Sequence, residues 1–580
     1  MAEQLTGYPS IDKPWLKYYT GEAINSPLPD CSMYQLIWEN NKDHLDDTAL
    51  IFLGKEISYR DLFNQIDRLA NAFTAIGIKE NDIVTLMMIN QPETVYCLYA
   101  LNRIGAVANM INVFSGTKEI ERYLDEGESK YLIAADLFYG KCCPAAENRQ
   151  IRQFITVPLL HSCGLVKRIG YKLKVRTPIN KNNKMVMTWN QLMKKGLAEK
   201  PAEKPHNPAK CSVIGHTSGT TGFPKGVLIS DNAVNAIASH YDKAFEHRRQ
   251  ESLLNLIVPF ALYGLVVNLH MPLSLGMKVI LIPKVEPEKT DELILKHKPN
   301  YVISVPIYWT ALIESAKIQD LSFLKIAAAG GAGSSKEQIA ELNKLLKKHH
   351  AETGFLIGYG MSENGATACS QMNGCTKDGS VGIPLVKNTM SVFDPVTLKE
   401  KKYCETGEIC ITGPSMMLGY LKNESETNRM LRKHEDGHVW LHTGDLGHMD
   451  EDGFVFVQGR MNRVYMTQHN GAVAKIYPEA IEKAINKHKA VKESCAVCVS
   501  DKPNFFKPVV FCVLNENCSM KQDELASVLC ALCEKELPEY DIPVKILFPK
   551  EIPHTAQGKT DYRVLEKEAG QMKNAILRID

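Results

Sequence analysis

The chain has 580 residues, of which 44% are hydrophobic and 23% are charged. These proportions are those of an ordinary globular protein, and the length allows more than one domain and a large core. Lys and Arg number 68 against 66 Asp and Glu, which leaves a formal net charge of +2. Such a balanced chain creates no global field that would attract nucleic acid, so we expect no nucleic-acid partner and only local anion binding.

The cysteines and the N-terminus indicate a reducing compartment. Residues 1–30 are polar and interrupted by proline, without the basic and then apolar pattern of a secretion signal. Sixteen cysteines in a chain without such a signal favour free thiols and a cytoplasmic location. The most apolar run, 256–267, is shorter than the ~20 residues that span a bilayer, and we interpret it as buried core.

Apolar runs alternate with helical periods along most of the chain, which is typical of an α/β protein. The alternation is visible over 48–136 and becomes regular after a proline-rich linker at 199–210. Strands are predicted at 278–282, 301–305 and 324–329, and helices at 291–298 and 334–348. Ser334 and Glu337 form a predicted capping box at the start of the last helix. Glycine-rich turns fall where strands end, which is where open α/β sheets bind ligands.

A final segment from about Gly459 is long enough for a small separate domain. Strands are predicted there at 494–499 and 508–514, and a helix at 522–537. Two Cys-x-x-Cys pairs lie in this segment, but 31 residues separate them, more than the ~15–20 of a zinc ribbon. Cys495 and Cys498 would point to opposite faces of a strand, so we interpret them as core residues.

The segment 164–176 carries five basic residues and no acidic one, interleaved with apolar side chains. In one interpretation it is the solvated face of a connecting element. In the other, residues 165–176 make a weak peripheral contact with an anionic membrane surface, which for a cytoplasmic protein is the inner face.

The strongest chemical signal is the segment 216–226, HTSGTTGFPKG, which holds four hydroxyl side chains, three glycines and one lysine. Glycines let backbone N–H groups face an anion, hydroxyls add hydrogen bonds, and Lys225 adds a positive charge. A Ser/Thr/Gly run also suits a mobile surface loop, but Pro224 and Lys225 between glycines favour a polyphosphate site. The spacing is not that of a Walker A loop.

Two glycine-rich turns add groups that a nucleotide needs. The turn 330–333 follows a predicted strand and would let a flat ring lie against the backbone. The loop 358–363 offers the aromatic face of Tyr359, the hydroxyl of Ser362 and the carboxylate of Glu363, a ligand type that Mg²⁺ prefers. Each turn taken alone is equally compatible with close packing.

Three later clusters supply charged groups. Asp445, in the segment 442–446, could accept both hydroxyls of a ribose, although this segment taken alone is a β-turn. Arg460 follows Gly459 and could reach ribose or phosphate oxygens. The segment 553–563 contains Lys559 in a Gly-Lys-Thr run, but a proline stands where a Walker A loop needs glycine.

In this order and spacing, the clusters resemble the motifs of the adenylate-forming (ANL) superfamily of AMP-binding enzymes, and most closely its acyl-CoA synthetases, such as fatty-acid–CoA ligases. The resemblance covers about residues 40–567. It implies an α/β fold with a large N-terminal domain of mixed and parallel sheets flanked by helices, 1–461, and a small mobile α+β lid, 462–580. It also implies ATP, Mg²⁺ and coenzyme A as cofactors and a small-molecule carboxylic acid as substrate.

The resemblance also implies a role for each motif residue. The β- and γ-phosphates would be held by Thr217, Ser218, Gly219, Thr220, Thr221, Gly222 and Lys225. The nucleotide base would be framed by Gly331, Ala332, Tyr359 and Gly360, and the α-phosphate and Mg²⁺ would contact Ser362 and Glu363, the latter as the metal ligand. The ribose would be held by Asp445 and Arg460, while Lys559 would bridge the substrate carboxylate and the α-phosphate. Catalysis is expected from Lys559, Glu363, Ser362 and Lys225. Cations stabilise the developing negative charge, which Lys559 and Lys225 supply directly and Glu363 supplies through the Mg²⁺ that it would hold, while Ser362 would contact the α-phosphate.

The acid pocket is expected around Phe260, Tyr263 and Gly264. Peptide-synthetase relatives place an Asp in this stretch to pair an ammonium group, whereas 256–264 carries no charge here. A buried ammonium without a partner is costly, so we expect an uncharged fatty or aryl tail. The stretch also lacks the His that many acyl- and aryl-CoA synthetases carry.

The start of the lid departs from the family pattern. Asn462 stands at the hinge position, where relatives have Asp or Lys, and the run 459–478 is longer than usual, with Gly471 displaced. Adenylation is therefore better supported than thioester formation. Coenzyme A is the expected acceptor, and the phosphopantetheine thiol of a carrier protein is the alternative. A non-catalytic nucleotide-binding relative is a remote third possibility, disfavoured by the intact Lys225, Glu363, Asp445 and Lys559.

Overall fold

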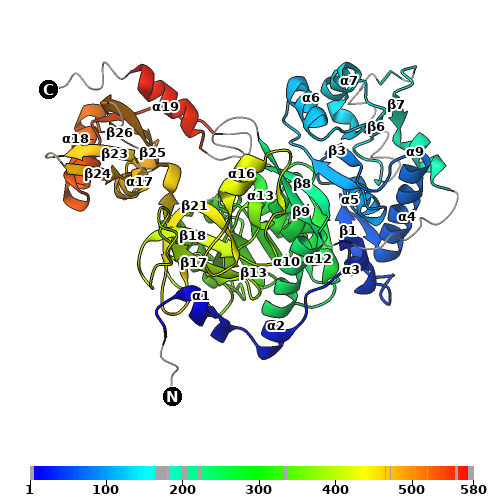
Figure 1. Cartoon of the computed structure of the whole chain (residues 1–580), viewed down its shortest axis with the longest axis horizontal. Coiled ribbons are helices and arrows are strands. Elements are labelled where there is room, and N and C mark those ends of the chain that lie inside the picture. Colours follow the sequence, from blue (N-terminus) through cyan, green and yellow to red (C-terminus); the bar gives the residue numbers. More distant parts are fainter. Residues whose placement is uncertain are drawn as a thin grey trace.

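The computed structural model describes residues 5–163, 179–180, 182–197, 207, 209–217, 224–331, 333–334, 336–463, 465–469, 472–502, 505–516, 518, 520–554 and 560–572. Figure 1 shows a large N-terminal body of sheets flanked by helices and a small C-terminal body beside it. This is the α/β fold with two unequal parts that the sequence predicts. The domain boundary predicted at 461/462 falls in the helical turn η6 (Met461–Arg463) and stays a prediction.

Two large sheets make up most of the N-terminal body. The nine-stranded sheet contains, in spatial order, β16 (Ile383–Pro384), β15 (Cys369–Ser370), β14 (Phe355–Tyr359), β13 (Ile326–Ala329), β12 (Tyr301–Ser304), β10 (Ser252–Asn255), β11 (Lys278–Leu281), β1 (Thr48–Phe52) and β2 (Lys55–Ser58). The eight-stranded sheet contains β19 (Gly419–Tyr420), β9 (Lys225–Ser230), β8 (Cys211–Thr217), β4 (Val107–Met110), β3 (Ile83–Met87), β5 (Tyr131–Ala135), β6 (Gln153–Val157) and β7 (Val186–Thr188). Their central strands are parallel, so the carboxyl ends of neighbouring strands share one edge.

Three smaller sheets follow along the chain. The five-stranded sheet contains β17 (Thr389–Phe393), β18 (Gly407–Thr412), β21 (Val439–Met449), β20 (Leu431–Lys433) and β22 (Val455–Arg460). The small body contains the hairpin of β23 (Tyr465–His469) and β24 (Ala472–Ile476) and the sheet of β25 (Val491–Lys502), β26 (Phe505–Leu514) and β27 (Lys545–Leu547).

The α-helices are α1 (Pro9–Asp12), α2 (Gly21–Asn25), α3 (Met33–Glu39), α4 (Tyr59–Ala75), α5 (Pro92–Arg103), α6 (Thr117–Glu126), α7 (Tyr139–Asn148), α9 (Trp189–Lys195), α10 (Asp231–Ala244), α11 (Leu262–Leu265), α12 (Met271–Ser274), α13 (Thr290–His297), α14 (Ile307–Glu314), α15 (Lys336–Lys348), α16 (Glu424–Met430), α17 (Pro478–Ile485), α18 (Gln522–Glu536) and α19 (Tyr562–Gln571). Short 3₁₀ or π turns are η1 (Pro14–Tyr18), η2 (Asp136–Phe138), η3 (Val266–His270), η4 (Pro287–Lys289), η5 (Ser362–Asn364) and η7 (Glu539–Asp541).

Helix α4 illustrates how sequence fixes an element. The Ser58 side chain accepts a hydrogen bond from the N–H of Asp61 and so caps the helix. Apolar residues recur every three or four positions from Tyr59 to Phe73 and are buried. The helix therefore packs one apolar face on the core and leaves its polar face to solvent.

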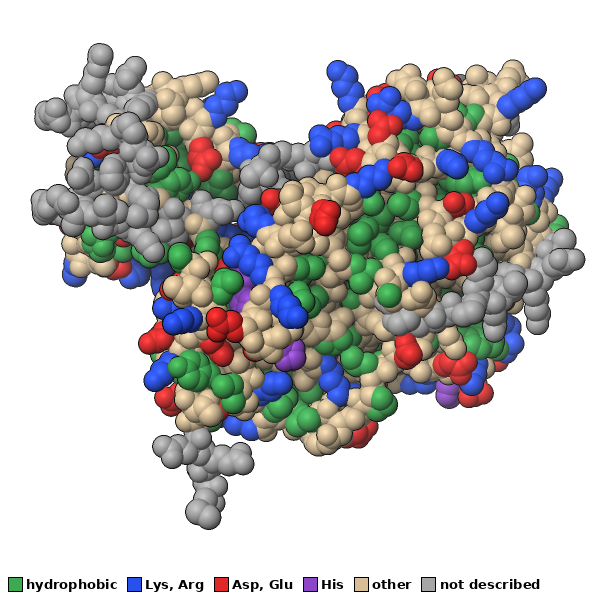
Figure 2. Space-filling model, viewed as in Figure 1, with side chains coloured by type: hydrophobic (Ala, Val, Ile, Leu, Met, Phe, Trp, Pro, Cys, Tyr) green, Lys and Arg blue, Asp and Glu red, His purple; other side chains and the backbone are tan. Residues whose placement is uncertain are grey.

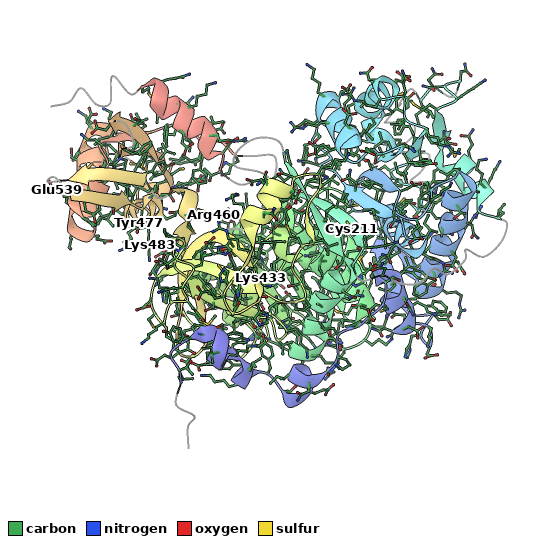
Figure 3. The ribbon with its side chains drawn as sticks, in the orientation of Figure 1. Cys211, Lys433, Arg460, Tyr477, Lys483 and Glu539 are labelled. Carbon is green, nitrogen blue, oxygen red and sulfur yellow. The ribbon has the colours of Figure 1, made fainter. Side chains whose placement is uncertain are left out.

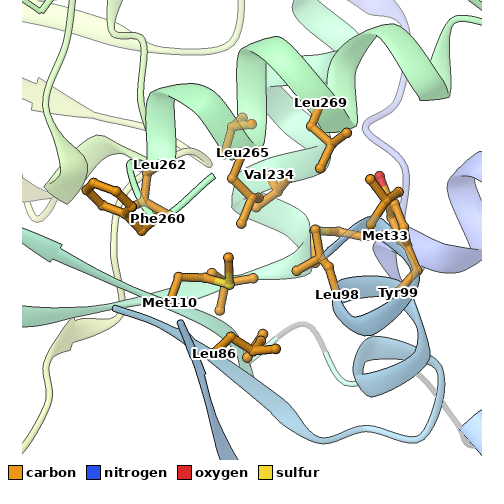
Figure 4. Close-up of a cluster of buried hydrophobic side chains, with 14 of the residues drawn as sticks. Met33, Leu86, Leu98, Tyr99, Met110, Val234, Phe260, Leu262, Leu265 and Leu269 are labelled. Carbon is orange, nitrogen blue, oxygen red and sulfur yellow. The ribbon is translucent and has the colours of Figure 1, made fainter. Parts of the chain in front are cut away.

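The core lies on both faces of the nine-stranded sheet. Successive residues of its strands enter different clusters: Leu253 joins the main core, while Leu254 joins the cluster under α13–α15. Figure 4 shows part of the main core, where Met110 lies near Val234 and Leu265. A sheet buried on both faces has apolar strands without polar alternation, which explains the continuous apolar runs of the sequence.

Most predicted elements are confirmed. The strands predicted at 278–282, 301–305 and 324–329 are β11, β12 and β13, and the predicted helices 291–298 and 522–537 are α13 and α18. Cys495 and Cys498 lie in β25 and pack into two different clusters, as residues on opposite faces must. The run 256–267 is largely buried core. All sixteen cysteines are free thiols.

Two local predictions are wrong. The helix α15 begins at Lys336, and the Ser334 hydroxyl has no hydrogen-bond partner among the described residues, so Ser334 does not open a capping box. The segment 442–446 is not a β-turn but part of the strand β21. Its Gly444 has φ +72 and lies near a shift in the pairing register of β21 and β22. A glycine is needed at such an irregularity, and it makes the composition of the segment look like that of a turn.

None of the described helices is long and apolar enough to cross a membrane.

Candidate active site

The predicted phosphate loop connects the antiparallel strands β8 and β9. Thr217 pairs with Lys225 at the mouth of this hairpin, so both residues flank the loop between them. Ser218, Gly219, Thr220, Thr221 and Gly222 lie outside the described residues. Behind the hairpin, the His216 ring contacts the Asn109 side chain at 2.6 Å. Burial lowers the pKa of His216 to about 3, so this ring is neutral and structural.

Lys225 is held by a carboxylate that the sequence analysis did not identify. Its Nζ lies 2.5 Å from Oε2 of Glu426 in α16 and 4.9 Å from the centre of the Tyr420 ring. Arg429 also pairs with Glu426, at 3.0 Å. Hydrogen bonds from Arg429 and Lys225 lower the pKa of Glu426 to about 2, so this carboxylate is ionised at neutral pH. The cation is thus pre-positioned at the phosphate loop.

Tyr420 links Lys225 to the predicted metal ligand. Its hydroxyl donates a hydrogen bond of 2.6 Å to Oε1 of Glu363 in η5, whose first residue is Ser362. Glu363 is only 7% exposed, and within the described part of the chain no Lys, Arg or His pairs with it. A buried carboxylate without a cationic partner fits a divalent metal ion, which takes oxygen ligands and frequently only one or two carboxylates.

Asp445 is the centre of a second polar group. Oδ2 accepts a 2.5 Å hydrogen bond from the Tyr359 hydroxyl, and Oδ1 lies 2.8 Å from Nε of Arg460. Burial, and then the neighbouring Asp445, raises the pKa of Tyr359 well above its usual value, so the hydroxyl stays a donor. Asp445 and Arg460 face each other across β21 and β22, while Tyr359 ends β14 of the nine-stranded sheet. The structure thus joins residues from two sheets that are 86 positions apart in the chain.

A buried layer under Asp445 fixes its backbone. Glu408 in β18 accepts one hydrogen bond from the Gly444 N–H at 3.0 Å and contacts His442 Nδ1 at 2.8 Å with its other oxygen. The other nitrogen of His442 lies 2.9 Å from Nε2 of His434. Glu408, Cys410 and His442 are close enough to hold a metal ion, but the hydrogen bonds between them already satisfy the carboxylate and the ring. We therefore assign this layer a structural role.

Close backbone approaches explain the glycines of the site. A Cβ at Gly360 would lie 1.9 Å from the carbonyl oxygen of Ala366, so only glycine fits there. Gly331 has φ +79 and follows β13, the parallel neighbour of β14 that ends at Tyr359. Both glycines thus stand at the carboxyl edge of the nine-stranded sheet. Ala332 lies outside the described residues.

The residues predicted for the acid pocket occupy different environments. The Tyr263 hydroxyl donates to the Ser304 carbonyl at 3.3 Å, and a Cβ on Gly330 would lie 3.4 Å from it, so Tyr263 lies beside the glycine turn. Gly264 packs against the Val258 carbonyl, where a Cβ would lie at 2.4 Å. Phe260 is buried in the main core (Figure 4). A small apolar cavity deeper between the sheet and α10 is lined by residues that include Tyr241, Phe245, Met271, Tyr301 and Ile303.

The molecule has a broad indentation on its surface. In Figure 2 the molecule is hollowed at the top, between the small body and the lobe that contains β3 and β5. Figure 3 labels Arg460 where β22 leads from the large body to the small one. Lys559 and the side chain of Asn462 lie outside what the structure describes. Tyr420, Glu426 and Glu408 were missed because their meaning depends on tertiary partners and not on local spacing.

Comparisons with known proteins agree with this geometry. The family model of AMP-binding enzymes matches residues 37–421, and the model of the AMP-binding enzyme C-terminal domain matches residues 480–559. The chain is 29% identical to a long-chain-fatty-acid–CoA ligase of Bacillus subtilis over 571 residues, which is 96% of this chain and 98% of the relative. It is 28% identical to a probable 4-coumarate–CoA ligase of Dictyostelium discoideum over 518 residues, 88% of this chain and 90% of the relative.

A solved structure confirms the fold. ATP-bound MatB from Rhodopseudomonas palustris superposes with a TM-score of 0.78 at 21% identity, over 93% of this chain and 100% of that one. The chain therefore belongs to the family of AMP-binding enzymes, in the adenylate-forming superfamily. It is an ATP-dependent, AMP-forming acid–thiol ligase.

Proposed function

We propose that this ligase activates a hydrophobic carboxylic acid with ATP and transfers the acyl group to coenzyme A. The observation that carries the proposal is a set of two polar groups. In the first group Asp445 contacts Tyr359 and Arg460. In the second group Tyr420 contacts both Glu363 and Lys225. The first group offers acceptors and donors for a ribose, and the second offers positive charge and a carboxylate beside a glycine- and hydroxyl-rich loop.

In the first half-reaction a carboxylate oxygen attacks the α-phosphorus of ATP. A C–O–P bond forms, the bond from the α-phosphorus to the bridging oxygen breaks, and pyrophosphate leaves. Thr217 and Lys225, at the mouth of the loop, would hold the β- and γ-phosphates, and Lys559 would balance charge between carboxylate and α-phosphate. A general base is unnecessary, because the attacking acid is already ionised at pH 7.

The remaining site residues would orient the nucleotide. Asp445 would accept the ribose hydroxyls while Arg460 holds its carboxylate in place. Tyr359 and Gly331 would frame the base, since both end parallel strands. Glu363 and Ser362 would hold Mg²⁺ and the α-phosphate, and a bound Mg²⁺ neutralises phosphate charge. In the second half-reaction the thiol gives its proton to solvent, its sulfur attacks the acyl carbon and forms a C–S bond, and AMP leaves with the electrons of the acyl C–O bond.

The chemistry of the acid follows from the pocket. The stretch 256–264 has no charged side chain. An apolar tail gains free energy in such a site, whereas an ammonium would lose hydration without a partner. Relatives named for long-chain fatty acids and for 4-coumarate support a fatty or aryl acid.

One feature favours a second acceptor. The run 459–478, which is longer than in relatives, contains the hairpin of β23 and β24 at the start of the small body. A changed start of the lid would suit a carrier-protein phosphopantetheine as well as coenzyme A. The third alternative, a non-catalytic nucleotide-binding relative, is not supported.

A single reaction distinguishes these acceptors. The intact protein is incubated with ATP, Mg²⁺, coenzyme A and a mixture of fatty and aryl acids, and products are identified by mass spectrometry. Acyl-CoA with an equal amount of AMP is the expected result, and it identifies the acid. Acyl-adenylate without thioester would favour a carrier protein instead. Absence of ATP consumption with every fatty and aryl acid in the mixture would contradict the proposal.

We also propose that the basic segment 165–176 contacts an anionic membrane surface from a reducing compartment such as the cytoplasm. The segment itself lies outside the described residues. Phe114 and Leu137 are 66% and 49% exposed just after β4 and β5, at the same edge of the parallel sheet where β6 leads toward this segment. Apolar and basic side chains at one edge suit a lipid headgroup region.

Co-sedimentation with vesicles tests the membrane contact. Neutralising the five basic residues, namely Lys167, Arg168, Lys172, Lys174 and Arg176, is expected to reduce binding to anionic vesicles but not to alter the little binding to neutral ones. The matched control neutralises five exposed lysines elsewhere, namely Lys298 and the four of α15, Lys336, Lys344, Lys347 and Lys348. If both variants lost the same amount of binding to anionic vesicles, net charge alone would explain the loss, and a specific contact would be contradicted.

A further inference from the structure

The passage between the two bodies contains a buried arginine. Arg463 ends η6. It directly follows the predicted hinge position and stands three positions after Arg460, and only 11% of its side chain is exposed. Its guanidinium lies 2.6 Å from Oε1 of Glu482 and 3.0 Å from Oε1 of Glu479, and it donates to the Ala496 carbonyl at 2.7 Å. A guanidinium with this many partners is a rigid junction between the elements that supply them.

Arg463 also reaches the helix that follows Lys559 in the chain. The Tyr562 hydroxyl lies 3.2 Å from Nη1 of Arg463, and the guanidinium stacks on the Tyr562 ring at 4.0 Å. Tyr562 is the first residue of α19, three positions after Lys559. In Figure 1 the C-terminal end of α19 points away from the large body, so its first turn faces the large body. Arg463 therefore fixes the start of α19 within the small body.

Glu479 joins this junction to the nucleotide site. Its Oε1 accepts a second hydrogen bond, at 3.3 Å, from the backbone N–H of Arg460, whose side chain pairs with Asp445. Arg460 belongs to β22 of the large body, whereas Glu479 belongs to α17 of the small one. A Cβ on Gly459 would lie 2.6 Å from Glu479 Oε2, so the carboxylate sits directly against the end of β22. One carboxylate thus spans the predicted hinge.

We propose that Glu479 is a positioning residue that latches the small domain in the orientation required for adenylation. It holds the Arg460 backbone on one side and, through Arg463 and Tyr562, the start of α19 on the other. The inference rests on the proposed two-step reaction. A turn of the small domain about residues 461–462 would separate Glu479 from Arg460 but leave the contacts of Arg463 with Glu482, Ala496 and Tyr562 intact, because these residues move together.

Measuring the two half-reactions separately tests the latch. In Glu479→Gln the hydrogen bond to Arg460 is weakened, and we expect single-turnover formation of acyl-adenylate to slow by about tenfold. Transfer from preformed acyl-adenylate to the thiol is expected to stay within about twofold. Gly459→Ala displaces the same carboxylate without changing its charge and also strains the backbone at the end of β22, where φ is +157, so it is expected to loosen the same contact and to have the same asymmetric effect.

Glu482→Gln is the matched control. It removes the charge of another carboxylate that pairs with the same arginine. Among the described residues, the partners of this carboxylate are the Arg463 guanidinium, the Ala496 N–H and the Cys495 thiol, all inside the small domain. We expect a lower Tm and an unchanged ratio of the two half-reaction rates. If Glu479→Gln slows both half-reactions equally, or slows neither, the latch is overturned.

A distance measurement keeps this test independent of the reaction. Spin labels attached through non-natural amino acids at Val396 and Val528, which are exposed on the large and small bodies, report the separation of the two. Glu479→Gln is expected to broaden the distance distribution, and Glu482→Gln to leave it as in the wild type. An unchanged distribution in Glu479→Gln would overturn the latch even if no acid were ever found to be adenylated.

Discussion

Single residues of the site act through their partners. Asp445 is 4% exposed, yet its two oxygens contact a tyrosine hydroxyl and a guanidinium from different strands. Glu408 holds the neighbouring Gly444 N–H from below. The carboxylate is therefore fixed before any nucleotide arrives, which reduces the entropy lost on binding.

Asp445→Asn is expected to raise the KM for ATP by at least about tenfold, because an amide replaces the ionic partner of Arg460 and a charged acceptor of hydrogen bonds. Steady-state release of pyrophosphate measures this. The control is Asp450→Asn, at the end of β21, whose carboxylate lies 2.5 Å from Lys377. That change should lower Tm and leave KM near the wild-type value. A similar KM increase in both variants would argue against a specific role of Asp445.

The Lys225–Glu426 pair gives a second prediction. ATP must compete with Glu426 for the Lys225 ammonium, so Glu426→Gln is expected to lower the KM for ATP by about two- to fivefold, the size of a partly exposed ion pair. In a Lys225→Met background the same change should have no effect. Titrating ATP in the four proteins of this cycle measures the coupling. A higher KM in Glu426→Gln would mean that Glu426 itself supports the nucleotide.

At the scale of elements, α5 carries a carboxyl group that is unusual for its surroundings. Glu93 lies in the first turn of α5 and is fully buried. Its Oε1 accepts a 2.5 Å hydrogen bond from Ser162, while Oε2 has no partner among the described residues. Burial raises the pKa of Glu93 to about 7, so the folded protein favours the protonated acid.

The raised pKa makes stability depend on pH in a defined direction. The pKa of Glu93 in the folded protein lies above the 4.5 of an ordinary exposed glutamate, so its contribution to stability is full below pH ~4.5 and is lost as pH rises through 7. At pH 8 the ionised group costs about 3 kcal/mol. Glu93→Gln is therefore expected to raise Tm by several degrees at pH 8 and to change it little at pH 5, in thermal unfolding from pH 5 to 8.5. Glu435→Gln, on the surface, is the control, and a Glu93→Gln effect independent of pH would contradict the assignment.

At the scale of the whole molecule, the proposed mechanism requires the small domain to supply Lys559 to a site on the large one. Lys559→Ala is expected to reduce acyl-adenylate formation by about 100-fold or more, because no other group is assigned to the charge between carboxylate and α-phosphate. Thioester formation from supplied acyl-adenylate should remain near the wild-type rate. Rapid-quench assays of each half-reaction measure both. Adenylation at the wild-type rate would contradict the mechanism.

Local patterns were sufficient for much of the fold. The apolar runs at 278–282 and 301–305 predicted β11 and β12, because a strand buried on both faces needs no partner information to be recognised. The segment 442–446 was predicted wrongly, since Gly444 adopts φ +72 inside a strand and composition alone suggests a turn. Ser334 likewise resembles a helix cap, but the helix begins at Lys336.

The sequence by itself determined the class of protein and predicted a phosphate loop and the charged residues of the site, because glycines, hydroxyls and lysine at fixed spacing have meaning without long-range contacts. Only the tertiary structure decided which groups meet. Tyr420 between Glu363 and Lys225, Glu426 on Lys225, and Glu479 across the hinge all depend on strands and helices far apart in the chain. A carboxylate acquires its role from the cation or N–H group beside it, and that neighbour is set by packing and not by sequence distance.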